Sequence, residues 1–395
     1  MKRCARAAFV SFGMAMFGVA FAADPISLAI PLPLTGGQAK FGEMMKRSYE
    51  MAAEEVNAKG GVKGRKLALS FDDSQAKPDS ARAIVEKLID VKKQPLIVGE
   101  YTSACAKAVA AVANERKTPY LIVASADDAI TQQKYKYVFR QNVPNAYYAG
   151  GLVSFLQNVV KPQSIAIVYE SSDFGTSGAQ DMERQAQRIG MKVLMKEKYE
   201  KGAIDFKPIL SKVKQANPDV IYMVSYVMDA SLLMKQIKEL RIDSKLFAGG
   251  AAGFALPEFV DNAKDAAEFV VTATLWTPNV KYKGAAEYAA KYKAKYGDFP
   301  SYHGASAYSA IFVVQDVLNR SKSMSTEDIT TAMKKTNMQT AFGPVKFEDK
   351  DGYENQNFME TFVLQVQKGV HETVWPSATA NKMHIYPFPK WRERK

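Results

Sequence analysis

Residues with catalytic chemistry are few and scattered in this chain. Its three histidines, His303, His371 and His384, stand in unrelated contexts, and none is spaced from another His or Cys as zinc ligands are. The sequence has no Gly-x-Ser-x-Gly motif and no phosphate loop ending in Gly-Lys-Ser or Gly-Lys-Thr. The glycine-rich stretch 249–253 lacks the spacing of a dinucleotide-binding loop. We therefore expect a protein that is not an enzyme and needs no metal or cofactor.

Two further candidates have structural interpretations that we favour over catalysis. Cys105 lies one turn into an expected helix, whose start would favour a thiolate, but no His partner is evident and a buried small side chain accounts for it. Asp127 and Asp128 could serve as an acid and a base. A helix cap and its neighbour account for the same pair.

Binding chemistry is better represented, first of all in the stretch 99–117. A buried strand (94–99) is followed by the polar turn Tyr101-Thr102-Ser103 and then by an alanine-rich helix. The backbone N–H groups at such a helix start, just beyond a strand of an open α/β sheet, attract anions. Thr102 and Ser103 are therefore candidate ligand residues, although Ser103 could also simply cap the helix.

Other loops that follow expected strands carry rings and hydroxyls. Phe41, Ser125, Phe174 and Tyr226 occupy such positions. Each ring taken alone could belong to the core. Together, at equivalent topological positions, these residues predict a cleft for a small molecule.

The elements that would position these residues alternate between strand and helix. From Ile26, apolar strands are separated by amphipathic helices, and the same order restarts after Pro144. This alternation predicts an α/β fold with parallel sheets and two Rossmann-like lobes, and the cleft between the lobes is the expected site. Further along, 341–348 and 358–368 are expected to form a hairpin around the turn 349–352.

The first 22 residues resemble a secretory signal peptide. A basic head precedes an apolar run that ends in Ala20-Phe21-Ala22. Removing them leaves 373 of the 395 residues and lowers the net charge from +12 to +9. Lysines and glutamates interleave in the remainder, so we expect no nucleic-acid partner. We expect a soluble periplasmic protein that is too large for a single core and has Cys105 as its one cysteine.

The sequence also resembles the Leu/Ile/Val-binding protein family, the periplasmic receptors of ATP-driven importers for hydrophobic amino acids. The resemblance is carried by PLPLTGGQAKFGEMMKRSYEMAAEEVNAKGG, PDVIYMVSY, FGPVKFEDKDG and YPFPKW. It implies a type I periplasmic binding fold whose two lobes, joined by three crossings, close on the ligand. We expect lobe 1 to comprise 23–141 and 275–348, and lobe 2 to comprise 142–274 and 349–395.

The resemblance also implies roles for single residues. Ser103 matches the serine that binds the ligand carboxylate, and the loop Ser125-Ala126-Asp127 matches the small-residue loop after the fourth strand. The family's acidic residue that pairs with the ligand ammonium aligns with Ala251, so this partner is missing. The expected ligand-binding set is Phe41, Thr102, Ser103, Ser125, Ala126, Asp127, Phe174, Tyr226, Ala251 and Tyr308.

The missing acid leaves the ligand open. A branched-chain type of hydrophobic amino acid is the first expectation, with Asp127, Asp173 or Asp229 replacing the acid. The alternative is a ligand without an ammonium group, such as an aromatic acid or another carboxylate or amide. The expected partner is the membrane permease of an ABC importer, and we expect a monomer. A ligand-sensing module of a signalling system is the rival class.

Overall fold

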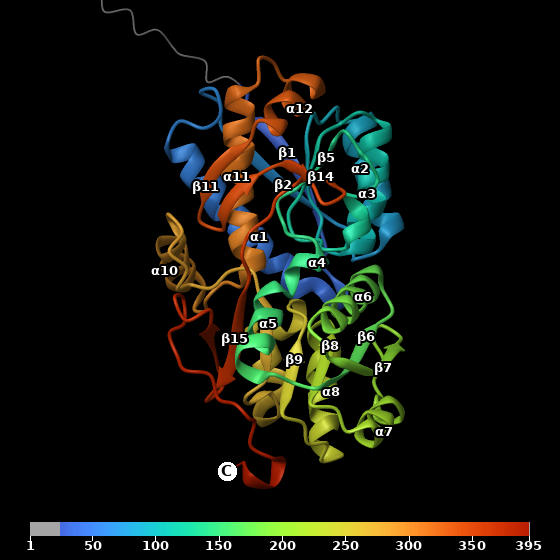
Figure 1. Cartoon of the computed structure of the whole chain (residues 1–395). Helices are drawn as coiled ribbons and strands as arrows, with labels where there is room; N and C mark the ends of the chain where they lie inside the picture. The colour runs from blue at the N-terminus through green and yellow to red at the C-terminus, as the bar shows by residue number, and fades with distance from the viewer. Residues whose placement is uncertain (1–23, 395) are drawn as a thin grey trace, which may run out of the picture.

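Two groups of strands, each flanked by helices, form two lobes (Figure 1). The computed structural model describes residues 24–394, so the expected signal peptide lies outside the described residues. Among these residues, no helix combines the length and apolar character that a membrane span requires.

Lobe 1 contains a five-stranded sheet with the order β13-β14-β5-β4-β3, the parallel pair β1–β2 and the antiparallel pair β11–β12. Its strands are β1 (Ile26–Leu32), β2 (Leu67–Asp73), β3 (Ile97–Gly99), β4 (Tyr120–Ile122), β5 (Val138–Arg140), β11 (Asn337–Thr340), β12 (Gly343–Lys346), β13 (Glu348–Lys350) and β14 (Tyr353–Gln356). Its helices are α1 (Ala39–Ala58), α2 (Pro78–Asp90), α3 (Ser103–Glu115), α10 (Ala285–Tyr296), α11 (Tyr302–Arg320) and α12 (Thr326–Lys334).

Lobe 2 contains a seven-stranded sheet with the order β16-β15-β10-β9-β8-β6-β7. Its strands are β6 (Ser164–Glu170), β7 (Lys192–Tyr199), β8 (Val220–Val224), β9 (Leu246–Gly249), β10 (Val271–Thr274), β15 (Phe362–Gln367) and β16 (Val370–Trp375). Its helices are α4 (Asn145–Tyr148), α5 (Gly150–Phe155), α6 (Asp173–Arg188), α7 (Lys207–Ala216), α8 (Val227–Glu239) and α9 (Pro257–Ala263).

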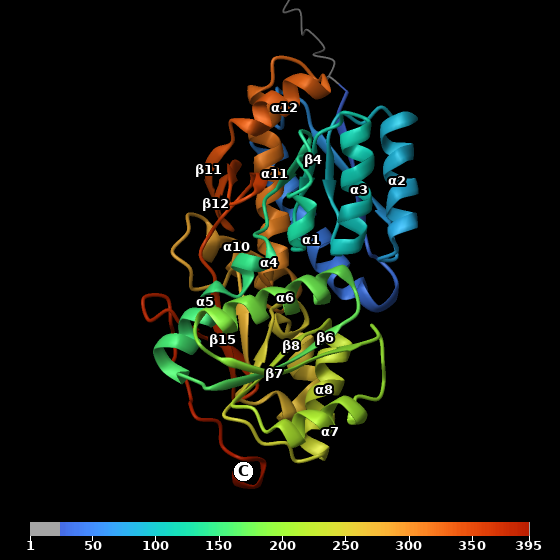
Figure 2. The same ribbon diagram turned by 45° about the vertical axis from the view of Figure 1, so that its right-hand side comes forward.

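The lobe 1 sheet is buried on both faces, because successive side chains of a strand point to opposite sides. Ile97 and Ile122 pack with α2 and α3, whereas Val98 and Leu121 pack with α1 and α11. Figure 2 shows α2 and α3 together on one side of this lobe and α11 on the other. The apolar strands and alternating helices of the sequence therefore give the α/β fold that we expected.

The chain crosses between the lobes three times, but the last crossing comes later than we expected. The crossings follow β5, β10 and β14. We placed residues 349–356 in lobe 2, yet Gln356 of β14 pairs with Arg140 of β5 in lobe 1. The expected hairpin between 341–348 and 358–368 is also wrong. Its turn is real, but it joins β13 to β14, and β15 pairs with β10 and β16.

Candidate ligand-binding site

On lobe 1, the loops after β3 and β4 are bonded to each other. The Thr102 hydroxyl caps α3 by accepting the N–H of Cys105 at 3.3 Å. The Oγ of Ser103 accepts the N–H groups of Ala126 at 3.3 Å and Asp127 at 3.2 Å. These bonds hold the loop after β4 against the start of α3, where the N-terminus of the helix suits the binding of an anion.

The Ser125 hydroxyl, on the loop after β4, also joins the same two loops. It lies 3.0 Å from the carbonyl oxygen of Tyr101 and 3.1 Å from that of Thr102, and it can donate to either. The hydroxyl is therefore engaged with backbone rather than directed at a ligand. Its neighbour Ala126 lines the interlobe cavity together with Ser103.

On lobe 2, two glycines let backbone segments come close together, and these contacts position Phe174 and Tyr226. A Cβ on Gly175 would lie 2.1 Å from the carbonyl oxygen of Glu170, so only glycine lets α6 begin this close to the end of β6. The Glu170 carboxylate accepts the Gly175 N–H at 2.9 Å and so caps this helix. A Cβ on Gly253 would lie 2.4 Å from the carbonyl carbon of Tyr226, which brings the loop after β9 against the start of α8.

Aromatic rings from both lobes pack between these loops. Phe41 stacks on Tyr101 with ring centroids 4.5 Å apart. The rings of Tyr101 and Tyr226 meet across the lobes with centroids 6.1 Å apart and planes tilted by 56°, and Phe174 lies 5.5 Å from Tyr226. His303 lies 5.3 Å from Tyr101, with its ring edge-on. Such offset and edge-to-face pairs are favourable ring geometries.

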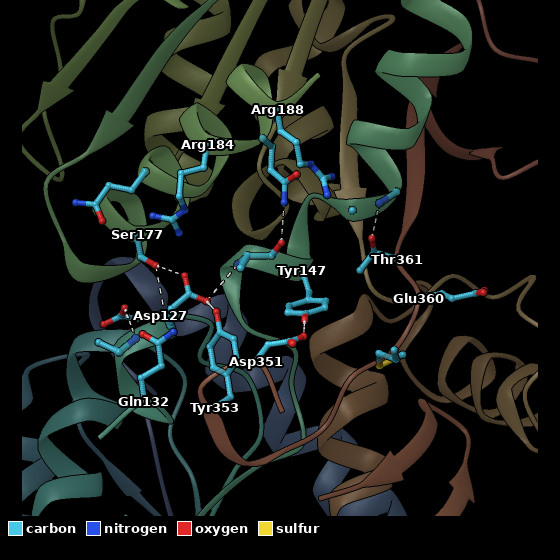
Figure 3. Close-up of a pocket in the computed structure, with 18 of the residues that line it drawn as sticks. Asp127, Gln132, Tyr147, Ser177, Arg184, Arg188, Asp351, Tyr353, Glu360 and Thr361 are labelled. Atoms are coloured by element: carbon cyan, nitrogen blue, oxygen red, sulfur yellow. Dashed lines mark hydrogen bonds between the residues drawn. The ribbon is translucent and has the colours of Figure 1, made fainter. Parts of the chain in front are cut away.

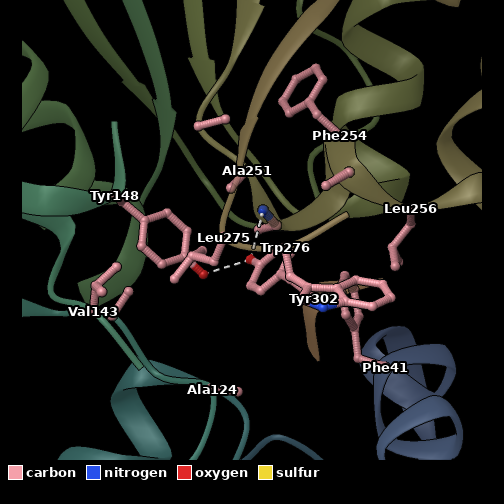
Figure 4. Close-up of a cluster of buried hydrophobic side chains, with 14 of the residues drawn as sticks. Phe41, Ala124, Val143, Tyr148, Ala251, Phe254, Leu256, Leu275, Trp276 and Tyr302 are labelled. Atoms are coloured by element: carbon pink, nitrogen blue, oxygen red, sulfur yellow. Dashed lines mark hydrogen bonds between the residues drawn. The ribbon is translucent and has the colours of Figure 1, made fainter. Parts of the chain in front are cut away.

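Tyr302 joins the lobes at the edge of this ring cluster. Its hydroxyl accepts a hydrogen bond from the backbone N–H of Ala252, in lobe 2, at 3.1 Å. The hydroxyl of Tyr148 donates to the same oxygen at 2.6 Å (Figure 4). Ala251 is fully buried beside this contact, and its N–H donates to Thr272 Oγ1 at 3.2 Å.

The cavity enclosed by these groups is small, at about 10 Å³. This volume holds about one water molecule, so an amino acid or aromatic acid could enter only if the lobes moved apart. The residues that line it carry rings, hydroxyls and methyl groups, and no carboxylate is among them. They are Tyr101, Ser103, Ala124, Ser125, Ala126, Tyr148, Phe174, Tyr226, Ala252, Tyr302 and His303.

Asp127 belongs to a different space. Its carboxylate accepts the N–H of Ala129 at 3.1 Å and lies 3.8 Å from the Lys107 ammonium. It lines a separate interlobe groove of about 1030 Å³, together with Asp173 (Figure 3). Burial raises the pKa of Asp127 above its ordinary value, and the N–H of Ala129 and the charge of Lys107 oppose that rise.

The expected site residues thus fall into four groups. Ser103, Ser125, Ala126, Phe174 and Tyr226 line the cavity. Phe41, Thr102 and Ala251 lie directly behind lining residues, whereas Asp127 faces the groove. Tyr308 is placed elsewhere.

Tyr308 does not approach the cavity. Its hydroxyl donates to Glu55 at 2.9 Å, and its ring stacks on Tyr288 with centroids 4.3 Å apart. The reason is helical geometry: Tyr308 comes five positions after His303 on α11, so the two side chains lie on different faces of the helix. Our assignment of Tyr308 to the cleft wall is corrected accordingly.

Four ring-bearing residues of the cavity were absent from the expected set, namely Tyr101, Tyr148, Tyr302 and His303. We considered His303 only as a catalytic or metal-binding residue. A usable signal was present, since Pro300-Ser301 precedes a long apolar helix and marks a helix start, where side chains can face a cleft.

The other buried carboxylates near the cavity already have partners. Glu100 accepts from the Ser74 hydroxyl at 2.6 Å and from the Tyr101 N–H at 3.0 Å, and burial raises its pKa to about 7. Asp229 accepts the N–H of Gly202 at 3.2 Å, and burial raises its pKa as well. Neither residue lines the cavity.

Comparison with known proteins agrees with this architecture. Residues 25–370 match the periplasmic binding protein family, and the chain belongs to that family. Leu/Ile/Val-binding protein homolog 8 of Brucella suis is 30% identical over 400 residues, covering 94% of this chain and 96% of the relative.

Two solved structures extend the comparison to the fold. The leucine-binding protein LivK of Thermotoga maritima superposes with a TM-score of 0.81 at 25% identity, covering 88% of this chain and 97% of that one. A solute-binding protein of an ABC transporter from Rhodopseudomonas palustris, solved with 3,4-dihydroxybenzoic acid, superposes with a TM-score of 0.76 at 20% identity, covering 93% and 98%. The fold is therefore that of type I periplasmic binding proteins.

Proposed function

We propose that this protein is the periplasmic receptor of an ABC importer and that it binds a small carboxylate without an ammonium group, of which an aromatic acid fits best. The lobes would close over the ligand and present it to the membrane permease. The Rhodopseudomonas protein is a solute-binding protein of an ABC transporter, and the Brucella and Thermotoga proteins are named as binding proteins for hydrophobic amino acids, which supports the transport role.

The composition of the cavity lining carries the choice of ligand. The Ser103 hydroxyl and the start of α3 would form an anion site, and the rest of the lining consists mainly of rings. The resemblance aligns the family's ammonium-binding acid with Ala251, which ends in a methyl group. An ammonium buried without a counter-charge costs several kcal/mol.

The acids that could have replaced the missing partner lie elsewhere. Asp127 and Asp173 both lie near Lys107, with Asp173 at 3.5 Å from its ammonium, and both face the groove. Asp229 is buried beside Gly202. A ligand without an ammonium needs none of them.

Closure requires a ligand that touches both lobes, because only a difference in affinity between the two states shifts their populations. Ser103 and Tyr101 would contact the ligand from lobe 1, and Phe174 and Tyr226 from lobe 2. A ligand ring that contacts both Tyr101 and Tyr226 would meet this condition, because these two neighbouring rings come from different lobes.

A branched-chain amino acid is the second candidate. The names of the Brucella relative and of the Thermotoga protein favour it. In this case the faces of Tyr101 and Tyr226 would have to hold the ammonium by cation–π interactions, which suit a cation but do not replace a carboxylate.

A thermal-shift screen of residues 23–395 tests the proposal. Amino acids, their des-amino analogues, aromatic acids and small amides are added in turn. A ligand at 100 times its dissociation constant stabilises the protein by roughly 2.7 kcal/mol, which raises Tm by a few degrees. We expect shifts with aromatic acids and none with leucine, isoleucine or valine. Shifts with these amino acids alone would favour the second candidate.

A further inference from the structure

We propose that His303 selects among carboxylates by donating a hydrogen bond from Nε2–H to an oxygen atom on the body of the ligand. This inference rests on the proposed function, because it concerns the same cavity. It narrows the ligand class to carboxylates that also carry a hydroxyl or oxo oxygen.

The position of the ring is well determined by its neighbours. His303 is 2% exposed and lines the cavity at the first turn of α11. Its centroid lies 3.8 Å from that of Tyr302 and 5.0 Å from that of Phe41. Rings on several sides therefore leave the imidazole little freedom to turn.

Ser301 sets which nitrogen carries the proton. As the N-cap of α11, its Oγ accepts the backbone N–H of His303 at 3.3 Å. The same oxygen lies 3.2 Å from His303 Nδ1 and 3.1 Å from Met44 Sδ. The hydroxyl carries a single hydrogen, and the imidazole nitrogen is a stronger acceptor for it than the thioether. We assign this hydrogen to the bond with Nδ1, which places the ring hydrogen on Nε2.

That Nε2–H is left for a ligand. Within residues 24–394, the hydrogen bonds of the His303 ring involve Nδ1 alone. A donor that stays without a partner in a closed cavity is unfavourable, so an acceptor on the ligand would be favoured. Burial also lowers the pKa of His303 to about 3, so the ring is neutral at physiological pH and offers a donor without a charge.

The ligand class follows from two anchors on lobe 1. The carboxylate would occupy the anion site at Ser103, and a second oxygen would meet His303 across the ring-lined cavity. A body made only of hydrocarbon, as in benzoate or in the side chain of leucine, would leave the Nε2–H buried and unpaired. We therefore expect hydroxylated aromatic acids to bind better than the unsubstituted acid.

Calorimetric titration with benzoate and with 2-, 3- and 4-hydroxybenzoate tests this assignment. In the wild type, the best hydroxybenzoate should bind at least tenfold more tightly than benzoate. His303→Phe keeps a ring but removes the donor, and should reduce this preference to less than threefold. His303→Gln places an N–H near the former Nε2 and should restore most of it. His371→Phe is the control, because His371 bonds to the Phe254 carbonyl oxygen outside the cavity and should leave the preference unchanged.

The other possible outcomes distinguish a failure of the His303 assignment from a failure of the proposed ligand. If the acids bind but His303→Phe keeps the tenfold preference, or the wild type prefers benzoate, the assignment of His303 is overturned and the proposed function stands. If none of the four acids binds, the assignment of His303 falls together with the choice of an aromatic acid, and the wider proposal of a carboxylate ligand is decided by the thermal-shift screen. Should the Phe variant not fold, Ser301→Ala, which frees the proton to occupy either nitrogen, must lower the preference, and an unchanged preference contradicts the assignment.

Discussion

At the scale of single residues, Ser103 joins the two loops that would hold the ligand carboxylate. Its Oγ accepts the N–H groups of Ala126 and Asp127. For Ser103→Ala we expect Kd to rise at least tenfold, because the carboxylate loses a hydroxyl and the loop that presents the backbone donors is no longer fixed. Titration calorimetry with an aromatic acid found in the thermal-shift screen measures this change in Kd. Ser211→Ala, on an exposed serine of α7 that donates to the Lys207 carbonyl oxygen, should leave Kd unchanged.

Glu100, which is buried behind the same loop, makes the stability of the protein depend on pH. Burial raises its pKa from 4.5 to about 7 in the native protein, whereas the unfolded chain releases the proton near 4.5. The native state thus binds more protons within this window, and stability falls as pH rises through it. We expect the wild type to lose about 2–3 kcal/mol relative to Glu100→Gln between pH 4.5 and 7. Urea unfolding at both pH values measures this loss, and parallel curves for the two proteins would contradict it.

Prediction of residue placement from the sequence succeeded where a position follows directly from chain order, whereas a role of these residues in binding stays a prediction. Ser103, Ser125, Phe174 and Tyr226 each follow a strand, and the structure brings all four to one cavity. It failed for Tyr308, because the helical period decides on which face of α11 this side chain lies. The start of that helix reaches the cavity only through packing of α11 on α1, a contact between segments far apart in sequence. For the same reason, His303 and Tyr302 were not found.

At the scale of elements, α6 and the loop after β4 make a contact between the lobes. The Asp128 carboxylate accepts from Ser177 on α6 at 3.1 Å and from Tyr353 on β14 at 2.6 Å. It also accepts the N–H of Ala146, at the first crossing, at 3.2 Å. One carboxylate thus binds groups of both lobes and of a connecting segment, in the groove of Figure 3.

Removing the lobe 2 partner of this carboxylate should favour the open form. A hydrogen bond to a charged group contributes about 1.5–3 kcal/mol, although water replaces part of it when the lobes separate. For Ser177→Ala we expect Kd to rise about fivefold, which corresponds to about 1 kcal/mol. Titration calorimetry with an aromatic acid found in the thermal-shift screen measures this rise. Thr176→Ala, one residue earlier in the same groove, is the matched control, and an equal effect of both substitutions would argue against the contact.

The alternation of strands and helices was largely predictable because their apolar periods are regular. The prediction fails in the segment 341–368. Its local pattern of two apolar runs around Asp351-Gly352 predicts one hairpin, whereas the structure uses the turn for the short pair β13–β14. β15 instead joins β10 in the other lobe, a pairing that local pattern does not encode.

At the scale of the whole molecule, the lobes meet at both the cavity and the groove. The bond from the Ala252 N–H to Tyr302 and the bond from Ser177 to Asp128 both cross between them. The cavity of about 10 Å³ shows that closed lobes exclude anything larger than a water molecule unless side chains move. Ligand entry therefore requires these contacts to open, and the affinity for a ligand includes the free energy of opening and reclosing.

The most direct test of the proposed ligand class compares two molecules that differ only in the ammonium group. Leucine and 4-methylpentanoate share the same carbon skeleton and carboxylate. Titration calorimetry of residues 23–395 at one pH and salt concentration gives both dissociation constants. We expect 4-methylpentanoate to bind at least tenfold more tightly than leucine, because the cavity offers a carboxylate site and no counter-charge. Tighter binding of leucine would show that the ammonium is recognised and would contradict the proposal.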